Sequence, residues 1–330
     1  MNYLKKTARG LLLAATWVAL TTAFAQPQLP TSQQASLIAP YPAGSAFDIT
    51  ARQIQPELGR VLGKTIIVEN IGGASGSIGA QKLLNADSTH LNMLVGSPNE
   101  LALPPLMLSG VKYKPEEFRL VAHLTTGVLA IMARPDLPAK NMEELIAAGQ
   151  KQGAIPVSVA NAGLGSIFHL AAADLAKKSK IVVTHVPYKG GAPIMQDLIG
   201  RQIDLTILPL IPSYIQAAQE KKIKVLAVLG PARHSAMPDA PSIDEVQALK
   251  GTYYSMWTGL FVPTKLPVTS ADIVGKAANA TVGSPGFKAW VEERGNSAGT
   301  VMDLDKANAF YREEAGRFQK VASEIGLERQ

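Results

Sequence analysis

The sequence predicts an α/β protein folded into two lobes. Short apolar runs typical of strands alternate with helical patterns after about residue 36, which favours parallel strands with helices on both faces of a sheet. The chain has 330 residues, of which 47% are hydrophobic and 18% charged, so it is globular and long enough for two ordinary lobes. The alternative is one doubly wound sheet holding every strand.

The elements follow in order along the chain. Apolar residues at Phe47, Ile54, Leu58 and Leu62 recur at helical spacing, and the β-branched run at 65–69 is typical of a strand. Further helices are predicted at 78–86, 142–152, 166–178, 194–199 and 214–220, and the last 65 residues are expected to be mainly helical. Further strands are predicted at 37–39, 91–95, 128–133, 156–159, 181–186, 203–208, 225–229 and 257–262.

Prolines mark two places where the chain is expected to cross between lobes. Pro135 and Pro138 follow the strand at 128–133, and Pro263 and Pro267 follow the strand at 257–262. The predicted first lobe therefore comprises residues 26–125 plus 256–330, and the second lobe residues 126–255. The crossing strands near 126–134 and 255–263 are the predicted hinges.

The first 25 residues read as a secretory signal peptide. Lys5, Lys6 and Arg9 precede an apolar run from 11 to 20, and Ala23-Phe24-Ala25 supplies the small residues of a cleavage site. The alternative is a membrane anchor, but the run is shorter than the ~20 residues of a span. We therefore expect cleavage after Ala25 and a periplasmic location.

Composition excludes several classes of function. The absence of cysteine excludes disulfides, thiolate metal sites and thiol nucleophiles. Without the three basic residues of the signal peptide, the formal charge of +6 falls to +3. No run or stripe of Lys and Arg remains, so nucleic acid is not a predicted partner.

Three loops between a strand and a helix are candidate anion sites. In the first, Ser45 is a good helix N-cap after the small residues Ala43 and Gly44, and Asp48 stands three positions later, as in a capping box. A helix start presents free N–H groups and a positive dipole end, which suit a carboxylate. The alternative is a plainly capped helix in which Asp48 only caps.

The second and third candidate loops precede the predicted helices at 166–178 and 194–199. The second holds Gly163-x-Gly165-Ser166, but Phe168 replaces the third glycine of a dinucleotide fingerprint, so nucleotide binding is not predicted. The third holds Tyr188-Lys189-Gly190. Lys189 is expected to be solvated or to attract an anion, and a β-branched side chain at Gly190 is expected to intrude on the loop.

Catalytic patterns are weak. None of the five histidines forms a metal-ligand pair with acidic partners, and no Gly-x-Ser-x-Gly motif occurs. His169 and His185 are expected to make structural hydrogen bonds, and Trp257 is expected in the core. The sequence therefore predicts a protein that is not an enzyme and has no cofactor and no metal.

Landmarks spread over residues 37–330 resemble Bug-type solute receptors, the extracytoplasmic binding proteins of tripartite tricarboxylate transporters. They occur in the family order, and together they are specific. They are Pro40-Tyr41-Pro42-Ala43-Gly44 with Asp48 and Arg52, Val68-Glu69-Asn70 with Gly73-Ala74, Gly163-x-Gly165-Ser166-x-x-His169-Leu170, His185-Val186-Pro187-Tyr188-Lys189-Gly190, Asp197-Leu198 with Gly200 and Asp204, Arg233 with Pro238-Asp239-x-Pro241-Ser242, and Trp257-x-Gly259-Leu260-Phe261-x-Pro263.

The resemblance implies a two-lobed periplasmic-binding-protein (type II, Venus-flytrap) fold with two crossing strands. It further implies a small carboxylate ligand between the lobes, a monomer, and delivery to a membrane permease with a large and a small subunit. A sensor receptor and a secreted α/β hydrolase remain as alternative functions. The expected ligand-binding residues are Tyr41, Ala43, Gly44, Ser45, Phe47, Asp48, Ser97, Asn161, Gly163, Ser166, His169, Tyr188, Lys189, Gly190 and Leu208.

Two of these positions depart from the family pattern. Phe47 and Leu208 each stand where the family more often has a polar residue. We expect them to form an apolar wall that favours a monocarboxylate or dicarboxylate with an aliphatic or aromatic body over citrate or an amino acid. In the alternative, Phe47 folds back against its own helix and leaves the cleft polar.

Overall fold

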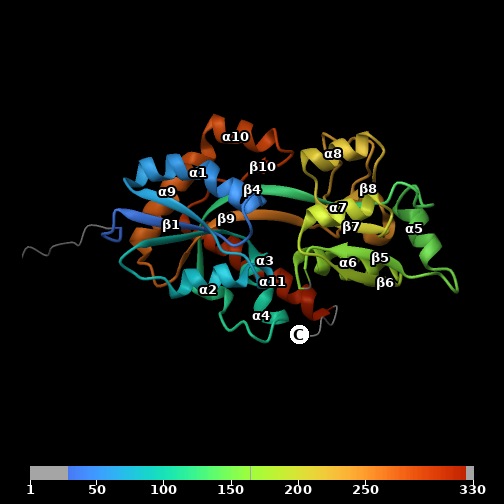
Figure 1. Cartoon of the computed structure of the whole chain (residues 1–330), viewed down its shortest axis with the longest axis horizontal. Helices are drawn as coiled ribbons and strands as arrows, with labels where there is room; N and C mark the ends of the chain where they lie inside the picture. Colours follow the sequence, from blue (N-terminus) through green and yellow to red (C-terminus); the bar gives the residue numbers. More distant parts are fainter. Residues whose placement is uncertain (1–28, 164, 325–330) are drawn as a thin grey trace, which may run out of the picture.

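Two groups of helices and strands lie side by side, joined by the long strands β4 (Phe118–Ala133) and β9 (Ser255–Pro263) (Figure 1). This computed structural model describes residues 29–163 and 165–324, so the predicted signal peptide at 1–25 lies outside the described residues. No helix in the described part of the chain has both the length and the apolar character of a membrane span.

The first lobe is built on a sheet in the order β2-β1-β3-β9-β4. Its parallel strands are β1 (Gln34–Ala39), β2 (Thr65–Asn70) and β3 (Leu91–Gly96), and the short β10 (Ser297–Ala298) pairs with β4. Side chains of α1 and α9 share one apolar core with this sheet, and side chains of α2 and α11 share another. The helices are α1 (Ala46–Leu62), α2 (Ser77–Asn85), α9 (Val268–Gly283), α10 (Pro285–Glu292) and α11 (Leu304–Glu324), with 3-10 turns η1 (Ala74–Gly76) and η2 (Pro115–Glu117).

The second lobe is built on β5 (Val157–Asn161), which runs parallel to β6 (Val183–Pro187) and β7 (Leu205–Pro209). The end of β4 pairs with β7 and also with β8 (Lys224–Val228). One apolar core unites these strands with their helices. The helices are α5 (Met142–Gly149), α6 (Ile167–Ser179), α7 (Gly191–Ile199) and α8 (Pro212–Gln219), with 3-10 turns η3 (Ile243–Glu245) and η4 (Gln247–Leu249).

Strand β4 belongs to both sheets. Its residues up to Val128 pair with β9, and from Leu129 onward they pair with β7. The expectation of parallel sheets is wrong for β4 and β9, because both run antiparallel to every neighbour. The predicted strand at 128–133 covers only the second-lobe end of β4. The earlier part was not predicted, because polar residues such as His123 and Thr125 interrupt its apolar pattern. These two side chains are nevertheless buried and bonded, His123 to Thr126 and Thr125 to Thr258.

The lobes also touch outside the crossing strands. The short helices α3 (Pro98–Leu101) and α4 (Pro104–Met107) follow β3, and Leu103 between them packs into the core of the second lobe. Phe318 and Ala322, near the end of α11, pack into the same core. The seam between the lobes therefore has apolar contacts as well as covalent crossings.

Candidate ligand-binding site

The three candidate loops meet where parallel strands of both lobes end, which is where open α/β sheets bind ligands. The Tyr41 hydroxyl oxygen of the first loop lies 3.4 Å from the Ser75 carbonyl oxygen. A Cβ on Gly163 in the second loop would lie 3.5 Å from Ser75 Oγ. The Tyr188 N–H of the third loop donates to the Asn161 carbonyl at 2.9 Å. The three loops are therefore neighbours across the seam.

The first loop is held by Asp48, which is 3% exposed. Its carboxylate accepts hydrogen bonds from Gly44 N–H at 2.8 Å, and from Arg52 Nε and Asn70 Nδ2, both at 2.9 Å. Burial alone raises the pKa of Asp48, but these hydrogen bonds outweigh it and hold the pKa below its usual value. Asp48 therefore holds the loop as an ionised carboxylate bonded to Gly44, one residue before the N-cap Ser45, so the predicted capping box does not form, and the contact of Asp48 with a ligand stays a prediction.

The start of α1 combines a satisfied cap with exposed small residues. Ser45 Oγ accepts the Asp48 N–H at 3.3 Å, while Ala43 and Gly44 are exposed. Phe47 is 4% exposed, belongs to the first-lobe core and stacks on Tyr41 with ring centroids 4.6 Å apart. This packing agrees with the alternative in which Phe47 folds back from the cleft.

The second loop is closed by its own hydrogen bonds. Ser166 Oγ donates to the Gly163 carbonyl at 2.7 Å and accepts the His169 N–H at 3.3 Å. His169 Nδ1 accepts the Gly165 N–H at 3.1 Å, and its ring meets His185 with centroids 4.4 Å apart. Burial, and secondly His185, lowers the pKa of His169 to about 4, so its ring is neutral at pH 7. Ser166 and His169 therefore fix the backbone of this loop.

The third loop leads into a helix without a cap. No side chain in the described part of the chain caps α7, whose N-cap is Gly190 at φ 146°. The first N–H groups of α7 are thus available to an anion. The Tyr188 hydroxyl donates to Asp197 at 2.6 Å, and Lys189 is exposed, as expected of a solvated lysine.

Tyr214 is a residue that the sequence analysis did not single out. A Cβ on Gly191 would lie 2.7 Å from the Tyr214 hydroxyl and 3.7 Å from Leu208 Cδ1. These distances place both side chains next to the start of α7. Leu208 is 2% exposed, and Tyr214 is half-buried. Tyr214 lies on α8, after the carboxyl end of β7. Because the strand at 203–208 is also followed by a loop and a helix, this fourth junction could have been predicted as part of the site.

Asn161 is the most unusual polar side chain at these loops. It is fully buried at the carboxyl end of β5, and neither atom of its amide has a partner among the described residues. His185 Nδ1, on a neighbouring strand, also lacks one. Because an unmet buried polar group costs about 1–3 kcal/mol, the Asn161 amide calls for a ligand or water partner.

A buried polar cluster supports the first loop from behind. Ser97 caps α3, and its backbone N–H and hydroxyl both donate to the Glu100 carboxyl. The Tyr41 hydroxyl donates to Glu100 Oε2 at 3.3 Å. Asn99 Nδ2 in turn donates to the Tyr41 hydroxyl at 2.6 Å. The sequence suggested Tyr41 and Ser97 but not Asn99 and Glu100, whose bonds to Tyr41 join residues 58 and 59 positions apart.

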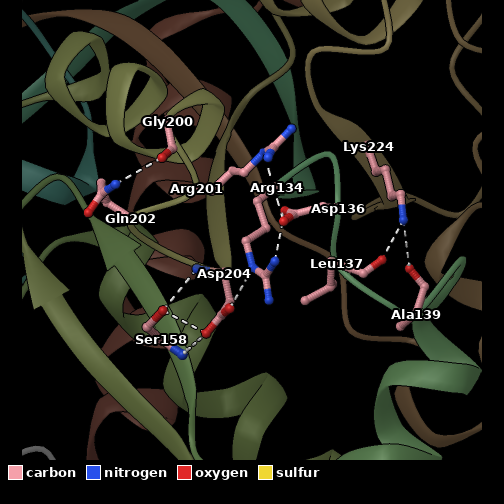
Figure 2. Close-up of polar contacts among 10 residues, drawn as sticks. All are labelled: Arg134, Asp136, Leu137, Ala139, Ser158, Gly200, Arg201, Gln202, Asp204 and Lys224. Carbon is pink, nitrogen blue, oxygen red and sulfur yellow. Dashed lines mark hydrogen bonds and ion pairs between the residues drawn. The ribbon is translucent and has the colours of Figure 1, made fainter.

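Other conspicuous features lie away from these loops. At the amino ends of β5 and β7, Asp204 accepts from Arg134 Nε at 2.9 Å and from Ser158 Oγ at 2.7 Å (Figure 2). Asp136 pairs with the same Arg134 at 2.7 Å (Figure 2). Asp204, one of the landmarks of the resemblance, is therefore a structural anchor. A cavity of about 420 Å³ lies at the amino ends of β1 and β3, between Thr31, His90 and Leu266.

These observations define a two-lobed solute-binding protein whose candidate loops meet between the lobes. Comparisons with known proteins then identify the family. Residues 50–327 match the model described as "Tripartite tricarboxylate transporter family receptor". The chain belongs to this family of solute receptors, which are binding proteins and not enzymes.

Relatives and solved structures agree with this assignment. The chain is 33% identical to the "UPF0065 protein in the TAR-I ttuE-ttuC' intergenic region" of Agrobacterium vitis, over 96% of this chain and 91% of that protein. It is similar to the periplasmic binding protein BugD, with a TM-score of 0.77 and 28% identity, covering 90% of this chain and 99% of that one. It is also similar to MatC from Rhodopseudomonas palustris, solved with bound malate, with a TM-score of 0.75 and 25% identity, covering 87% and 98%. The two-lobed periplasmic-binding-protein fold predicted from the sequence is confirmed.

Proposed function

We propose that this chain is a periplasmic receptor that binds a small carboxylate between its lobes and delivers it to a permease with a large and a small membrane subunit. The observation that carries the proposal is the uncapped start of α7, which meets the other two loops at the seam. Its free N–H groups suit a carboxylate without a side-chain cation. The malate bound to MatC supports this ligand class.

The ligand is proposed to have an aliphatic or aromatic body. The half-buried ring of Tyr214 borders the start of α7, so an apolar body lies well beside it, whereas Leu208 is 2% exposed and packs in the second-lobe core. Phe47 contributes less than the sequence suggested, because its ring is packed against Tyr41. The Asn161 amide supplies a donor and an acceptor for one polar group of the ligand.

A thermal-shift screen followed by calorimetry tests the proposal. The panel should contain malate, adipate, benzoate and citrate, since a ligand that binds only the folded chain raises its melting temperature. We expect citrate to bind at least about tenfold more weakly than the best aliphatic or aromatic carboxylate, a difference of about 1.4 kcal/mol. A panel without any binder, or turnover of a bound compound, contradicts the proposal. Loss of uptake of the bound carboxylate in cells lacking the chain tests delivery.

We expect the two lobes to close on the ligand when it binds. Strand β4 changes its partner from β9 to β7 between Val128 and Leu129. The Leu129 N–H donates to the Tyr254 carbonyl, which directly precedes β9, so the two crossings lie close together, as a hinge requires. Small-angle scattering should show a smaller radius of gyration with a carboxylate that binds than without it. An unchanged radius contradicts a hinged receptor.

Removal of the Lys189 ammonium should have a modest effect. Lys189 is exposed and, within the described residues, forms no ion pair. Lys189→Ala should therefore weaken carboxylate binding by less than about tenfold, or ~1.4 kcal/mol. Calorimetry at low and at physiological salt measures the effect, with the exposed Lys151→Ala as the control. Complete loss of binding would show that the ammonium, and not the helix start, holds the ligand.

A further inference from the structure

One side chain connects the two lobes directly beside the candidate loops. Asn99 lies on α3, after the first-lobe strand β3, and is 6% exposed. Its Oδ1 accepts the N–H of Ile167, the first residue of the second-lobe helix α6, at 2.7 Å. Its Nδ2 donates to the Tyr41 hydroxyl of the first loop at 2.6 Å. Asn99 thus joins the first and second loops through a single amide.

The surroundings of Asn99 fix the direction of this amide. The Tyr41 hydroxyl accepts from Asn99 and donates to Glu100, while the Asn99 N–H donates to Ser97 Oγ at 3.2 Å. Because a backbone N–H can only donate, Ile167 requires the acceptor Oδ1, and this orientation leaves Nδ2 to donate to the Tyr41 hydroxyl. The first lobe therefore presents an oriented acceptor to the second lobe.

The N–H of Ile167 needs such an acceptor. It belongs to the first turn of α6, where backbone N–H groups have no partner within the helix. Ser166 Oγ takes the His169 N–H and leaves the Ile167 N–H to Asn99. Of the two bonds made by the Asn99 amide, the bond to Ile167 crosses between the lobes and breaks when they separate, while the bond to Tyr41 stays within the first lobe.

We propose that Asn99 is a positioning residue that latches the first turn of α6 to the first loop and so stabilises the closed receptor without touching the ligand. The inference rests on the proposed function, because closure is closure on a carboxylate. Neighbouring contacts form the same seam: a Cβ on Gly165 would lie 2.8 Å from Met107 Cβ, and Leu103 packs into the second-lobe core. A latch that forms after ligand entry should slow dissociation and leave association unchanged.

Distances between the lobes test the latch. The chain has no cysteine, so cysteines introduced at the exposed positions Arg60 and Lys222 carry the only spin labels. With malate or adipate as the probe, Asn99→Ala should shift the distance distribution toward the open state. It should also weaken binding about tenfold through a faster dissociation rate. The matched control is Thr206→Val, which removes a buried bond to the Ala160 carbonyl inside the second lobe. An Asn99→Ala variant with the wild-type distribution and affinity overturns the proposal, and so does an equal shift in Thr206→Val.

A second variant removes the other partner of the bond. Ile167→Pro deletes the N–H at the first helical position, where proline is tolerated, and Ser166 already has the extended conformation that precedes proline. If the bond is the latch, Asn99→Ala should have little further effect on the dissociation rate in the Ile167→Pro background. Additive effects of the two changes contradict the proposal.

Failure of the latch is distinguishable from failure of the proposed function. If no carboxylate binds the wild-type chain, the proposed function fails. The ligand-free distance distributions then decide the latch: a smaller closed fraction in Asn99→Ala than in wild type supports it, and identical distributions overturn it.

Discussion

Glu100→Gln should make the protein more stable at pH 8 and flatten the pH dependence of its unfolding free energy. Glu100 is fully buried, and within the described residues no cation forms an ion pair with it. Burial is the main cause that raises its pKa to about 8, against which the bonds from Ser97 act. The ionisable groups that face it are the hydroxyls of Tyr41, Tyr113 and Tyr311, which stay neutral over this range.

The sign of this effect follows from proton uptake. Between the ordinary glutamate pKa of 4.5 and a value of about 8, the folded chain holds a proton on Glu100 that the unfolded chain has released. The stability from this group is therefore complete below pH 4.5 and is lost as the pH rises to 8. The loss is at most about 1.4 kcal/mol per pH unit, and therefore on the order of 5 kcal/mol across the window.

Chemical denaturation at pH 5, 6.5 and 8 measures this effect. Gln at position 100 keeps an acceptor for the Ser97 N–H and cannot ionise, so its advantage over wild type should grow with pH. The control is Glu69→Gln, because bonds from Lys82 and Ser36 hold the pKa of Glu69 below its usual value. That pairing is lost as the pH falls, so its contribution has the opposite sign. If the unfolding free energy of Glu100→Gln depends on pH as that of the wild type does, Glu100 has the same protonation state in the folded and unfolded chains, and the prediction is wrong.

Local chemistry was sufficient to predict the elements that begin with a cap or alternate regularly. Ser45 and Ser166 cap α1 and α6 as their sequence context indicates, and the predicted strand at 91–95 corresponds to β3. The positions of the candidate loops follow from these elements, because loops after parallel strands gather at one edge of each sheet. The helix starts were therefore predictable to within about three residues, and the largest difference is at α7, which was predicted from 194 and begins at Gly191.

Contacts between distant residues were not predictable. Asn99 bonds to Tyr41 and Ile167, which are 58 and 68 positions away, and no periodicity records such pairs. The first half of β4 was not predicted, because it contains polar residues that are buried and hydrogen-bonded to other side chains. Phe47 was expected to line the cleft because of its position in the sequence, but its ring stacks on the ring of Tyr41.

Gly190→Val should weaken carboxylate binding by about ten- to a hundredfold. The reason given from the sequence, that the new side chain intrudes on the loop, is wrong: a Cβ at Gly190 would meet nothing within 4 Å. The reason lies in the backbone, because φ is 146° at this position and residues with a Cβ rarely adopt that conformation. Holding such strain costs about 1–3 kcal/mol.

The loop around Gly190 can escape this strain only by moving. A valine restores an ordinary φ by turning the peptide that leads into α7, and this displaces the N–H groups of Gly191 and Ala192 that are proposed to hold the carboxylate. Gly153→Val is the matched control, because Gly153 also has a positive φ, 77°, and open space around its Cβ, but lies in the exposed turn before β5. Both variants should lose stability in denaturation, and only Gly190→Val should lose affinity in calorimetry with malate or adipate. If Gly190→Val binds as wild type does while it is destabilised like Gly153→Val, the start of α7 is not the place where the carboxylate is held.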